Sequence, residues 1–145
     1  MDKVLTTLTD LEAEATRFTS TLVPDTGKAT LVTLSGELGA GKTAFTKAVA
    51  SALGVQDTVT SPTFVLEKIY RLPEGQAFKR LVHIDAYRLE SGKELAPLGF
   101  DEIMRDLQTL ILLEWPEKVA DTLPPPAVRI ALSVRDDGSR HMIYG

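Results

Sequence analysis

One short segment of the chain has the spacing of a phosphate-binding loop. It satisfies the pattern G-x-x-x-x-G-K-[ST] with Gly36, Glu37, Leu38, Gly39, Ala40, Gly41, Lys42 and Thr43. The glycines let the backbone curl so that successive N–H groups face an anion, and a helix that starts here adds its positive end. Lys42 supplies a mobile charge for the β- and γ-phosphates, and Thr43 supplies a hydroxyl for Mg²⁺. The segment predicts a nucleoside triphosphate site.

The sequence favours ATP over GTP as the nucleotide. Small GTPases read guanine with an N/T-K-x-D element, and the chain contains no asparagine. Its one Thr-Lys pair, Thr46-Lys47, continues with Ala48 and Val49 and therefore lacks the aspartate.

Two carboxylates follow apolar runs that are typical of buried strands. Asp85 follows Leu-Val-His-Ile, and Glu114 follows Leu-Ile-Leu-Leu. A P-loop ATPase needs a strand-end carboxylate for Mg²⁺ and a group that orients the attacking water. These residues suit both tasks, although each can also be a solvated acid at a strand end. His83 and His141 are too few for a zinc site, and we expect His83 to be a strand residue with a local partner.

Other residues are weaker candidates for the same site. Ser61, Pro62 and Thr63 lie where many P-loop proteins place a segment that senses the γ-phosphate, although the same residues also suit a plain turn. Trp115 suits a core, an interface or the site. Cations for the phosphates are available from Arg88, Lys118 and Arg140, which are otherwise solvated surface charges.

Local patterns indicate the elements that must position these residues. A capping box that begins at Thr9 predicts a first helix, which ends before Pro24. The β-branched run Thr30–Ser35 predicts a strand that leads into the glycines, and Thr43–Leu53 resumes helical spacing. The phosphate loop is therefore expected between a strand and a helix.

The remaining segments complete an alternating α/β pattern. We expect a hairpin of Phe64–Leu72 with Lys79–Tyr87, a broken helical region over Leu95–Leu107 whose regular part follows Asp101 as N-cap, a strand at Thr109–Glu114, a short helix from Pro116 to Leu123, and strands at Val128–Val134 and His141–Tyr144. This order predicts a three-layer, P-loop NTPase-like sandwich that has a mixed sheet with antiparallel edge strands. We interpret residues 1–145 as a single P-loop ATPase domain.

Composition narrows the class of protein. The 145 residues are 43% hydrophobic and 25% charged, which is typical of a globular chain. The absence of cysteine excludes disulfides, thiolate nucleophiles and iron–sulfur clusters. A net charge of −4 argues against tight binding of nucleic acid by this chain alone. No apolar stretch is long enough to cross a membrane, so we expect a soluble, cytoplasmic protein.

Five motifs in order resemble the bacterial TsaE family. They are G-E-L-G-A-G-K-T at 36–43, T-S-P-T-F at 60–64, H-I-D-A-Y-R at 83–88, L-G-F-D-E at 98–102 and E-W-P-E at 114–117. The resemblance implies the ATPase component of the machinery that makes N6-threonylcarbamoyladenosine (t6A) next to the anticodon of tRNA. It also implies TsaD and TsaB as partners, with tRNA reached indirectly through the complex.

The same resemblance implies roles for individual residues. Lys42, Asp85 and Glu114 would be catalytic, with Thr43 and Glu114 holding Mg²⁺ and Asp85 serving the metal or the water. Ser61, Pro62 and Thr63 would form a switch-like segment. The implied nucleotide-binding set is Thr9, Asp10, Gly36, Glu37, Leu38, Gly39, Ala40, Gly41, Lys42, Thr43, Ala44, Trp115, Lys118 and Arg140.

Two other functions remain open at this stage. A small-molecule P-loop kinase fits the length, although such kinases carry an arginine-rich lid and the arginines here are scattered singly. A nucleotide-gated adaptor would hold ATP without essential hydrolysis. The function that we expect is an ATP- and Mg²⁺-dependent hydrolase that is slow when alone.

Overall fold

The centre of the molecule is a seven-stranded sheet with the order β1-β7-β6-β2-β5-β4-β3. A computed structural model of the chain describes residues 2–55 and 67–145. The elements are β1 (Asp2–Leu5), α1 (Leu8–Thr21), β2 (Thr30–Ser35), α2 (Lys42–Ala52), β3 (Glu67–Arg71), β4 (Arg80–Asp85), η1 (Gly92–Leu98), α3 (Phe100–Met104), β5 (Thr109–Glu114), η2 (Pro116–Val119), β6 (Val128–Val134) and β7 (Arg140–Tyr144). None of the described helices is both long and apolar enough to cross a membrane.

Strand direction divides the sheet into a parallel centre and antiparallel edges. The strands β4, β5, β2 and β6 run parallel to one another, whereas β3, β7 and β1 each pair antiparallel with their neighbours. Strands that are covered on both faces require continuous apolar runs, as in the segment Leu110–Leu113. The predicted mixed sheet with antiparallel edge strands is confirmed.

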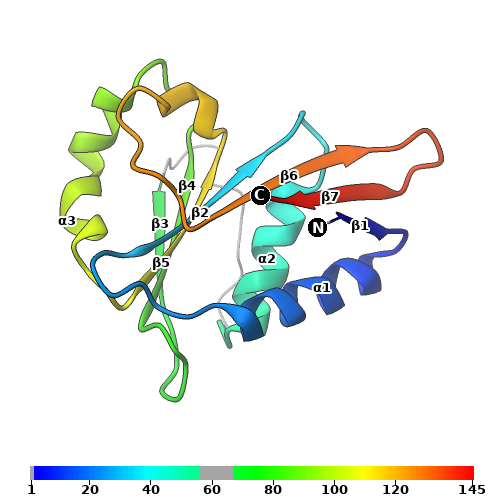
Figure 1. Cartoon of the computed structure of the whole chain (residues 1–145), viewed down its shortest axis with the longest axis horizontal. Coiled ribbons are helices and arrows are strands. Elements are labelled where there is room, and N and C mark those ends of the chain that lie inside the picture. The colour runs from blue at the N-terminus through cyan, green and yellow to red at the C-terminus, as the bar shows by residue number, and fades with distance from the viewer. Residues whose placement is uncertain (1, 56–66) are drawn as a thin grey trace.

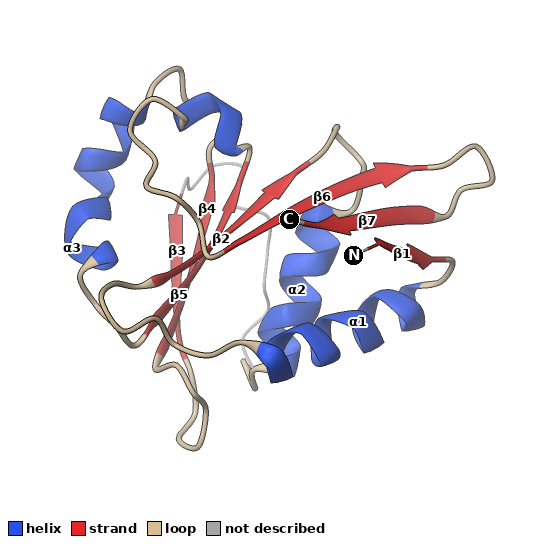
Figure 2. Cartoon of the chain, in the orientation of Figure 1, coloured by secondary structure: helices blue, strands red, loops and turns tan. Residues whose placement is uncertain are grey.

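Helices cover both faces of the sheet and give three layers (Figure 1, Figure 2). The helices α1 and α2 pack on one face, where Phe18 and Phe45 join Leu110 and Leu112 in one core cluster. On the other face, η1, α3 and η2 pack over Ile111 and the rest of a second cluster. Successive residues of β5 thus point to opposite cores, as the pleat of a strand requires.

The start of the chain differs from the expectation. Helix α1 begins at Leu8 and its cap is Thr7, whose hydroxyl accepts the N–H of Asp10 at 3.1 Å. The carboxylate of Asp10 accepts the N–H groups of Thr6 and Thr7 in return. The capping box therefore starts two residues before Thr9, because Asp10 fills the position where we expected glutamate. The strand β1 was not predicted, since four residues carry too little alternation to identify it.

Two further boundaries differ from the prediction, and one predicted pairing is confirmed. Asp101 is not an N-cap: α3 follows Gly99, which has the left-handed backbone that favours glycine, and Asp101 lies in the first turn. The helix predicted from Pro116 to Leu123 is the 3₁₀ turn η2, which ends at Val119. The hairpin is confirmed by the antiparallel pairing of β3 with β4, and residues 56–66 lie outside the described part of the chain.

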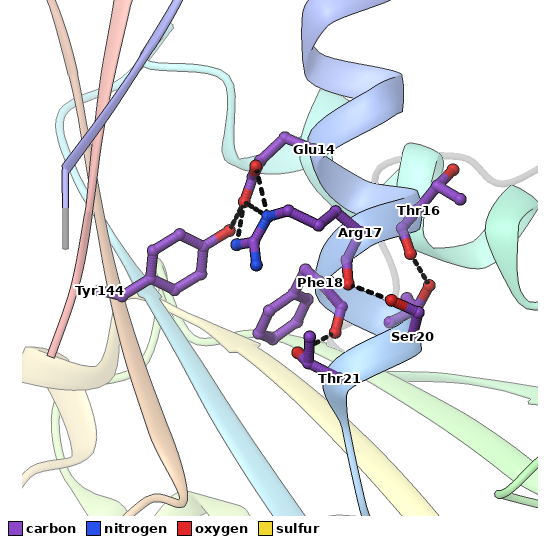
Figure 3. A network of polar contacts seen from close by, with 8 residues as sticks. Glu14, Thr16, Arg17, Phe18, Ser20, Thr21 and Tyr144 are labelled. Carbon is purple, nitrogen blue, oxygen red and sulfur yellow. Dashed lines mark hydrogen bonds and ion pairs between the residues drawn. The ribbon is translucent and has the colours of Figure 1, made fainter.

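A buried polar cluster fastens α1 to β7 (Figure 3). The carboxylate of Glu14 accepts a hydrogen bond from the Tyr144 hydroxyl and a 2.9 Å bond from Arg17 Nε. The ring of Phe18 packs against the Tyr144 ring with centroids 5.7 Å apart. Burial alone would raise the pKa of Glu14, but the bonds from Arg17 and Tyr144 outweigh it and lower that pKa. The cluster therefore joins residues 130 positions apart in the sequence.

We predict that Tyr144→Phe lowers the free energy of unfolding by about 1–3 kcal/mol, because the buried carboxylate of Glu14 loses a donor. Because the pKa of Glu14 is lowered in the folded state, this contribution is present above its unfolded pKa. It is lost as the pH falls through the folded pKa. Urea unfolding at several pH values measures both effects.

Thr16→Ala is the matched control, since Thr16 lies on the exposed side of the same helix. We expect it to change the unfolding free energy by no more than about 0.5 kcal/mol. An unfolding midpoint for Tyr144→Phe equal to that of the parent at neutral pH would contradict the role assigned to the cluster.

Candidate functional site

The loop from β2 to α2 has the backbone that its glycines predict. Gly36, Gly39 and Gly41 have φ angles of 146°, 79° and 105°. At Gly36 a Cβ atom would lie 2.3 Å from the carbonyl oxygen of Leu132, so no side chain fits there. Gly41 is the N-cap of α2, and the N–H groups of that helix therefore open onto the loop. The expected order of strand, loop and helix is confirmed.

Lys42 is held inside the site by two contacts. Its side chain is only 5% exposed, and Nζ donates a hydrogen bond to the Gly36 carbonyl. Nζ also lies 3.4 Å from the centre of the Trp115 ring. Burial lowers the pKa of Lys42, while the charges of Glu114, Glu117 and Asp85 act in the opposite direction. The ammonium group of Lys42 therefore lies between the Gly36 carbonyl and the face of the Trp115 ring.

Strand register brings the two predicted carboxylates together. Asp85 and Glu114 are opposite one another at the ends of the parallel strands β4 and β5. Alternation places both on the face that is covered by α2, because Leu81 and Leu112 on the same strands belong to that core. Burial raises the pKa of Asp85, and the neighbouring charge of Glu114 raises it further. The Asp85 carboxylate also accepts the N–H of Tyr87 at 3.0 Å.

Glu114 has a buried partner on the next strand. The side chains of His83 and Glu114 are 0% and 2% exposed, and His83 Nε2 lies 2.5 Å from Glu114 Oε2. This contact confirms that His83 is a strand residue with a local partner. It uses one of the two carboxylate oxygens of Glu114.

Trp115 has an unusual backbone next to Glu114. Its φ of 61° is the one positive value among the non-glycine residues described. The Trp115 N–H donates to Leu34 O at 3.1 Å, which ties the end of β5 to β2. Such a conformation costs of order 1–3 kcal/mol and needs support from its surroundings. Here it directs the indole ring onto Lys42.

Tyr87 is a residue that our sequence reasoning did not single out. Its ring packs against Trp115 with centroids 5.0 Å apart, and Lys118 Nζ lies 5.9 Å from the centre of the Tyr87 ring. The motif H-I-D-A-Y-R contains this tyrosine two residues after Asp85, and that spacing was the available signal.

A cavity of about 220 Å³ lies beside the loop, between α1, α2 and β7. It is lined by Leu5, Thr6, Thr7, Leu8, Leu11, Gly41, Ala44, Gly138 and Arg140. Of the sequence-predicted residues, Gly41, Ala44 and Arg140 line it. Thr9 and Asp10 do not: Thr9 is exposed, and Asp10 caps the helix whose first turn forms the wall. The cavity is lined instead by Thr6 and Thr7, which precede the predicted Thr9 by three and two positions.

The oxygen donors at the loop suit a magnesium ion. A hydroxyl on Thr43 and carboxylates on Asp85 and Glu114 are hard ligands of the kind that Mg²⁺ prefers. Within residues 2–55 and 67–145, no group of three or more His, Cys, Asp or Glu side chains could hold a metal ion. A Mg²⁺ ion that takes its remaining ligands from phosphates and water fits such a sparse donor set.

The remaining predicted residues divide into two groups. Glu37, Leu38 and Gly39 are exposed at the tip of the loop, and Ala40 is buried beneath it. Ser61, Pro62 and Thr63 lie outside the described residues.

Comparisons with known proteins show the family of the chain. The family model described as "Threonylcarbamoyl adenosine biosynthesis protein TsaE" matches residues 8–142. The tRNA threonylcarbamoyladenosine biosynthesis protein TsaE of Treponema pallidum is 40% identical over 112 residues, which are 77% of this chain and 78% of that protein. The protein of the same name from Bacillus subtilis is 37% identical over 114 residues, 79% of this chain and 68% of that protein.

The fold is similar to a solved structure as well. A crystal structure of YdiB from Bacillus subtilis has a TM-score of 0.77 and 28% sequence identity, and the match covers 99% of this chain and 83% of that one. This likeness shows the P-loop NTPase-like fold that the motif predicted. With the family model matching almost the whole chain, the protein belongs to the TsaE family of tRNA threonylcarbamoyladenosine biosynthesis.

Proposed function

We propose that this chain is a magnesium-dependent subunit that binds and hydrolyses ATP for t6A synthesis in tRNA. It would act in the cytoplasm with TsaD and TsaB, as a single P-loop ATPase domain over residues 1–145. One observation carries the proposal: Lys42, at the start of the helix that covers this face of the sheet, lies within electrostatic reach of the in-register carboxylates Asp85 and Glu114. The names of the relatives from Treponema pallidum and Bacillus subtilis support the modification pathway.

The triphosphate would bind at the loop and the first turn of α2. Backbone N–H groups and the helix dipole favour negative charge there. Lys42 would exchange the Gly36 carbonyl and the Trp115 face for the β- and γ-phosphate oxygens. Because the ammonium is already desolvated, this exchange requires little further dehydration.

A bound Mg²⁺ ion would neutralise charge that develops on the phosphates. Thr43 and Glu114 would hold the ion, and Asp85 would serve the ion or orient the attacking water. The adenosine would enter the cavity between α1 and β7, where Thr6 and Thr7 offer polar groups and Leu8 and Ala44 offer apolar contact.

The first test is steady-state ATP turnover of the purified chain, alone and with TsaB, TsaD and substrate tRNA. We expect slow turnover alone and stimulation by the partners. Lys42→Ala should reduce turnover by about 10²–10³-fold, since one preorganised charge at the phosphates is lost. Full Mg-ATP affinity and turnover in Lys42→Ala would rule out the proposed site. Equally fast turnover without partners would indicate an independent enzyme, and phosphate transfer to a metabolite would indicate a kinase.

A second test separates an ATPase from a nucleotide-gated adaptor. Glu114→Ala should abolish t6A formation in the reconstituted system while ATP binding and docking on the partners persist. Glu74→Ala, an exposed carboxylate in the β3–β4 turn, is the control and should retain modification. If tRNA is still modified by a Glu114→Ala protein that has no turnover, hydrolysis is not essential and the adaptor function is correct.

A third test follows the movement of Lys42 by fluorescence. Trp115 is the one tryptophan of the chain, so its emission reports on the site. We expect Mg-ATP to change this emission, because Lys42 Nζ leaves the indole face. Adenosine is the control ligand: it lacks phosphates and should leave the Lys42 contact and most of the emission unchanged. Unchanged emission at Mg-ATP concentrations that saturate an independent binding assay would contradict the proposed exchange.

A further inference from the structure

The imidazole of His83 is a buried polar group to which the proposed hydrolysis has given no role. Its Nε2 lies 2.5 Å from Glu114 Oε2. When Glu114 is ionised, as a carboxylate that binds a metal ion must be, its oxygen accepts and Nε2 supplies the proton of this bond. The other ring nitrogen, Nδ1, is buried and has no hydrogen-bond partner among the described residues. Among the described residues, Glu114 is therefore the one hydrogen-bond partner of the His83 ring.

The sheet fixes where this contact forms. His83 is opposite Leu112 in the register of β4 and β5, and Asp85 is opposite Glu114. His83 and Glu114 are thus diagonal neighbours on the face that α2 covers. The backbone of His83 lies within the paired strand β4, whereas Glu114 is the last residue of β5. The histidine is therefore the better anchored partner.

A purely stabilising role is a weak explanation for the pair. Buried ionic and polar pairs can commonly be replaced by apolar residues without loss of stability. Glu114 has three side-chain torsions, so its carboxylate adopts several positions unless a neighbour selects one. A hydrogen bond from His83 to Oε2 restricts these torsions, and Oε1 takes no part in it.

We propose that His83 is a positioning residue for the ATP-hydrolysing site. Its Nε2–H would hold Oε2 of Glu114, so that the remaining carboxylate oxygen would be available to a magnesium ion that Thr43 would also help to hold. This inference rests on the proposed function, in which Glu114 acts in magnesium-dependent hydrolysis. Partners that orient a metal-binding carboxylate typically contribute 10- to 100-fold in metal affinity or activity.

Two amide substitutions of His83 isolate the contact. In His83→Gln the side-chain N–H₂ can reach the position of Nε2. In His83→Asn the amide reaches only the position of Nδ1, which has no partner among the described residues. The two variants differ in reach rather than in polarity, so each serves as the control for the other. Urea unfolding establishes that both are folded under the assay conditions.

The principal readout is the affinity for a non-hydrolysable ATP analogue, measured as a function of Mg²⁺ concentration and again in EDTA. For His83→Asn we expect the apparent Mg²⁺ affinity and kcat to fall by about 10- to 100-fold. Affinity for the analogue in EDTA should stay within about twofold of the parent, because the phosphate loop is intact. His83→Gln should recover most of the Mg²⁺ affinity and kcat.

Each alternative result identifies which proposal fails. If His83→Asn keeps the Mg²⁺ dependence and kcat of an active parent, His83 has no positioning role and the proposed function stands. If both variants lose affinity equally in Mg²⁺ and in EDTA, the role of His83 is structural and the inference is wrong. If the parent itself neither hydrolyses ATP with its partners nor responds to Mg²⁺, the proposed function fails and the inference fails with it.

A double-mutant cycle tests the route through Glu114. Once Glu114 is changed to Gln, adding His83→Asn should cause little further loss of Mg²⁺ affinity, because the residue that His83 positions is already altered. Additive losses in the double variant would overturn the inference.

Discussion

The site depends on the parallel register of β2, β5 and β4. Parallel strands end at the same edge of a sheet, so the loop that follows β2 and the carboxylates that end β5 and β4 meet there. The register also sets the direction of each side chain. A shift of one residue in β5 would move Glu114 to the opposite face and replace it with Leu113. The same shift would break the contact between Glu114 and His83, because His83 would remain on the original face.

This edge of the sheet contains buried polar groups and a backbone conformation that would each destabilise the fold if they had no partner. A lysine, a glutamate and a histidine are buried, and Trp115 has a left-handed backbone. Each becomes tolerable through a specific neighbour: the Gly36 carbonyl and the indole face for Lys42, His83 for Glu114, and the Leu34 carbonyl for the Trp115 N–H. The cores on both faces of the sheet supply the stability that offsets these costs. The buried side chains of the candidate site are therefore held in place by their own neighbours.

How well each feature could be predicted from the sequence depends on how far apart its interacting residues lie along the chain. The strand, glycine loop and helix were predicted in the right order, because their pattern lies within a short stretch of sequence. The positions of the two carboxylates at strand ends were predicted because buried apolar runs end at them. The His83–Glu114 bond joins residues 31 positions apart and the Tyr144–Glu14 bond joins residues 130 apart. No local pattern encodes such distances, since they require the strand order. The cap at Thr7 was missed for the opposite reason: two overlapping T-x-x-[DE] patterns compete locally, and the contacts of Asp10 with Thr6 and Thr7 decide between them.

The cavity beside the loop depends on the outer strands of the sheet as well as on its centre. Its walls come from the first turn of α1 and from β7, whereas the phosphate loop comes from the centre of the sheet. The β1–β7 pairing, the Thr7 cap and the Glu14–Tyr144 bond hold these outer elements in place. Short terminal elements are usually the first to open locally. A ligand that spans the loop and the cavity would contact both parts, and so its binding energy would stabilise the terminal elements together with the core. At the proposed nucleotide site, occupancy would therefore change the stability of the elements that border the loop.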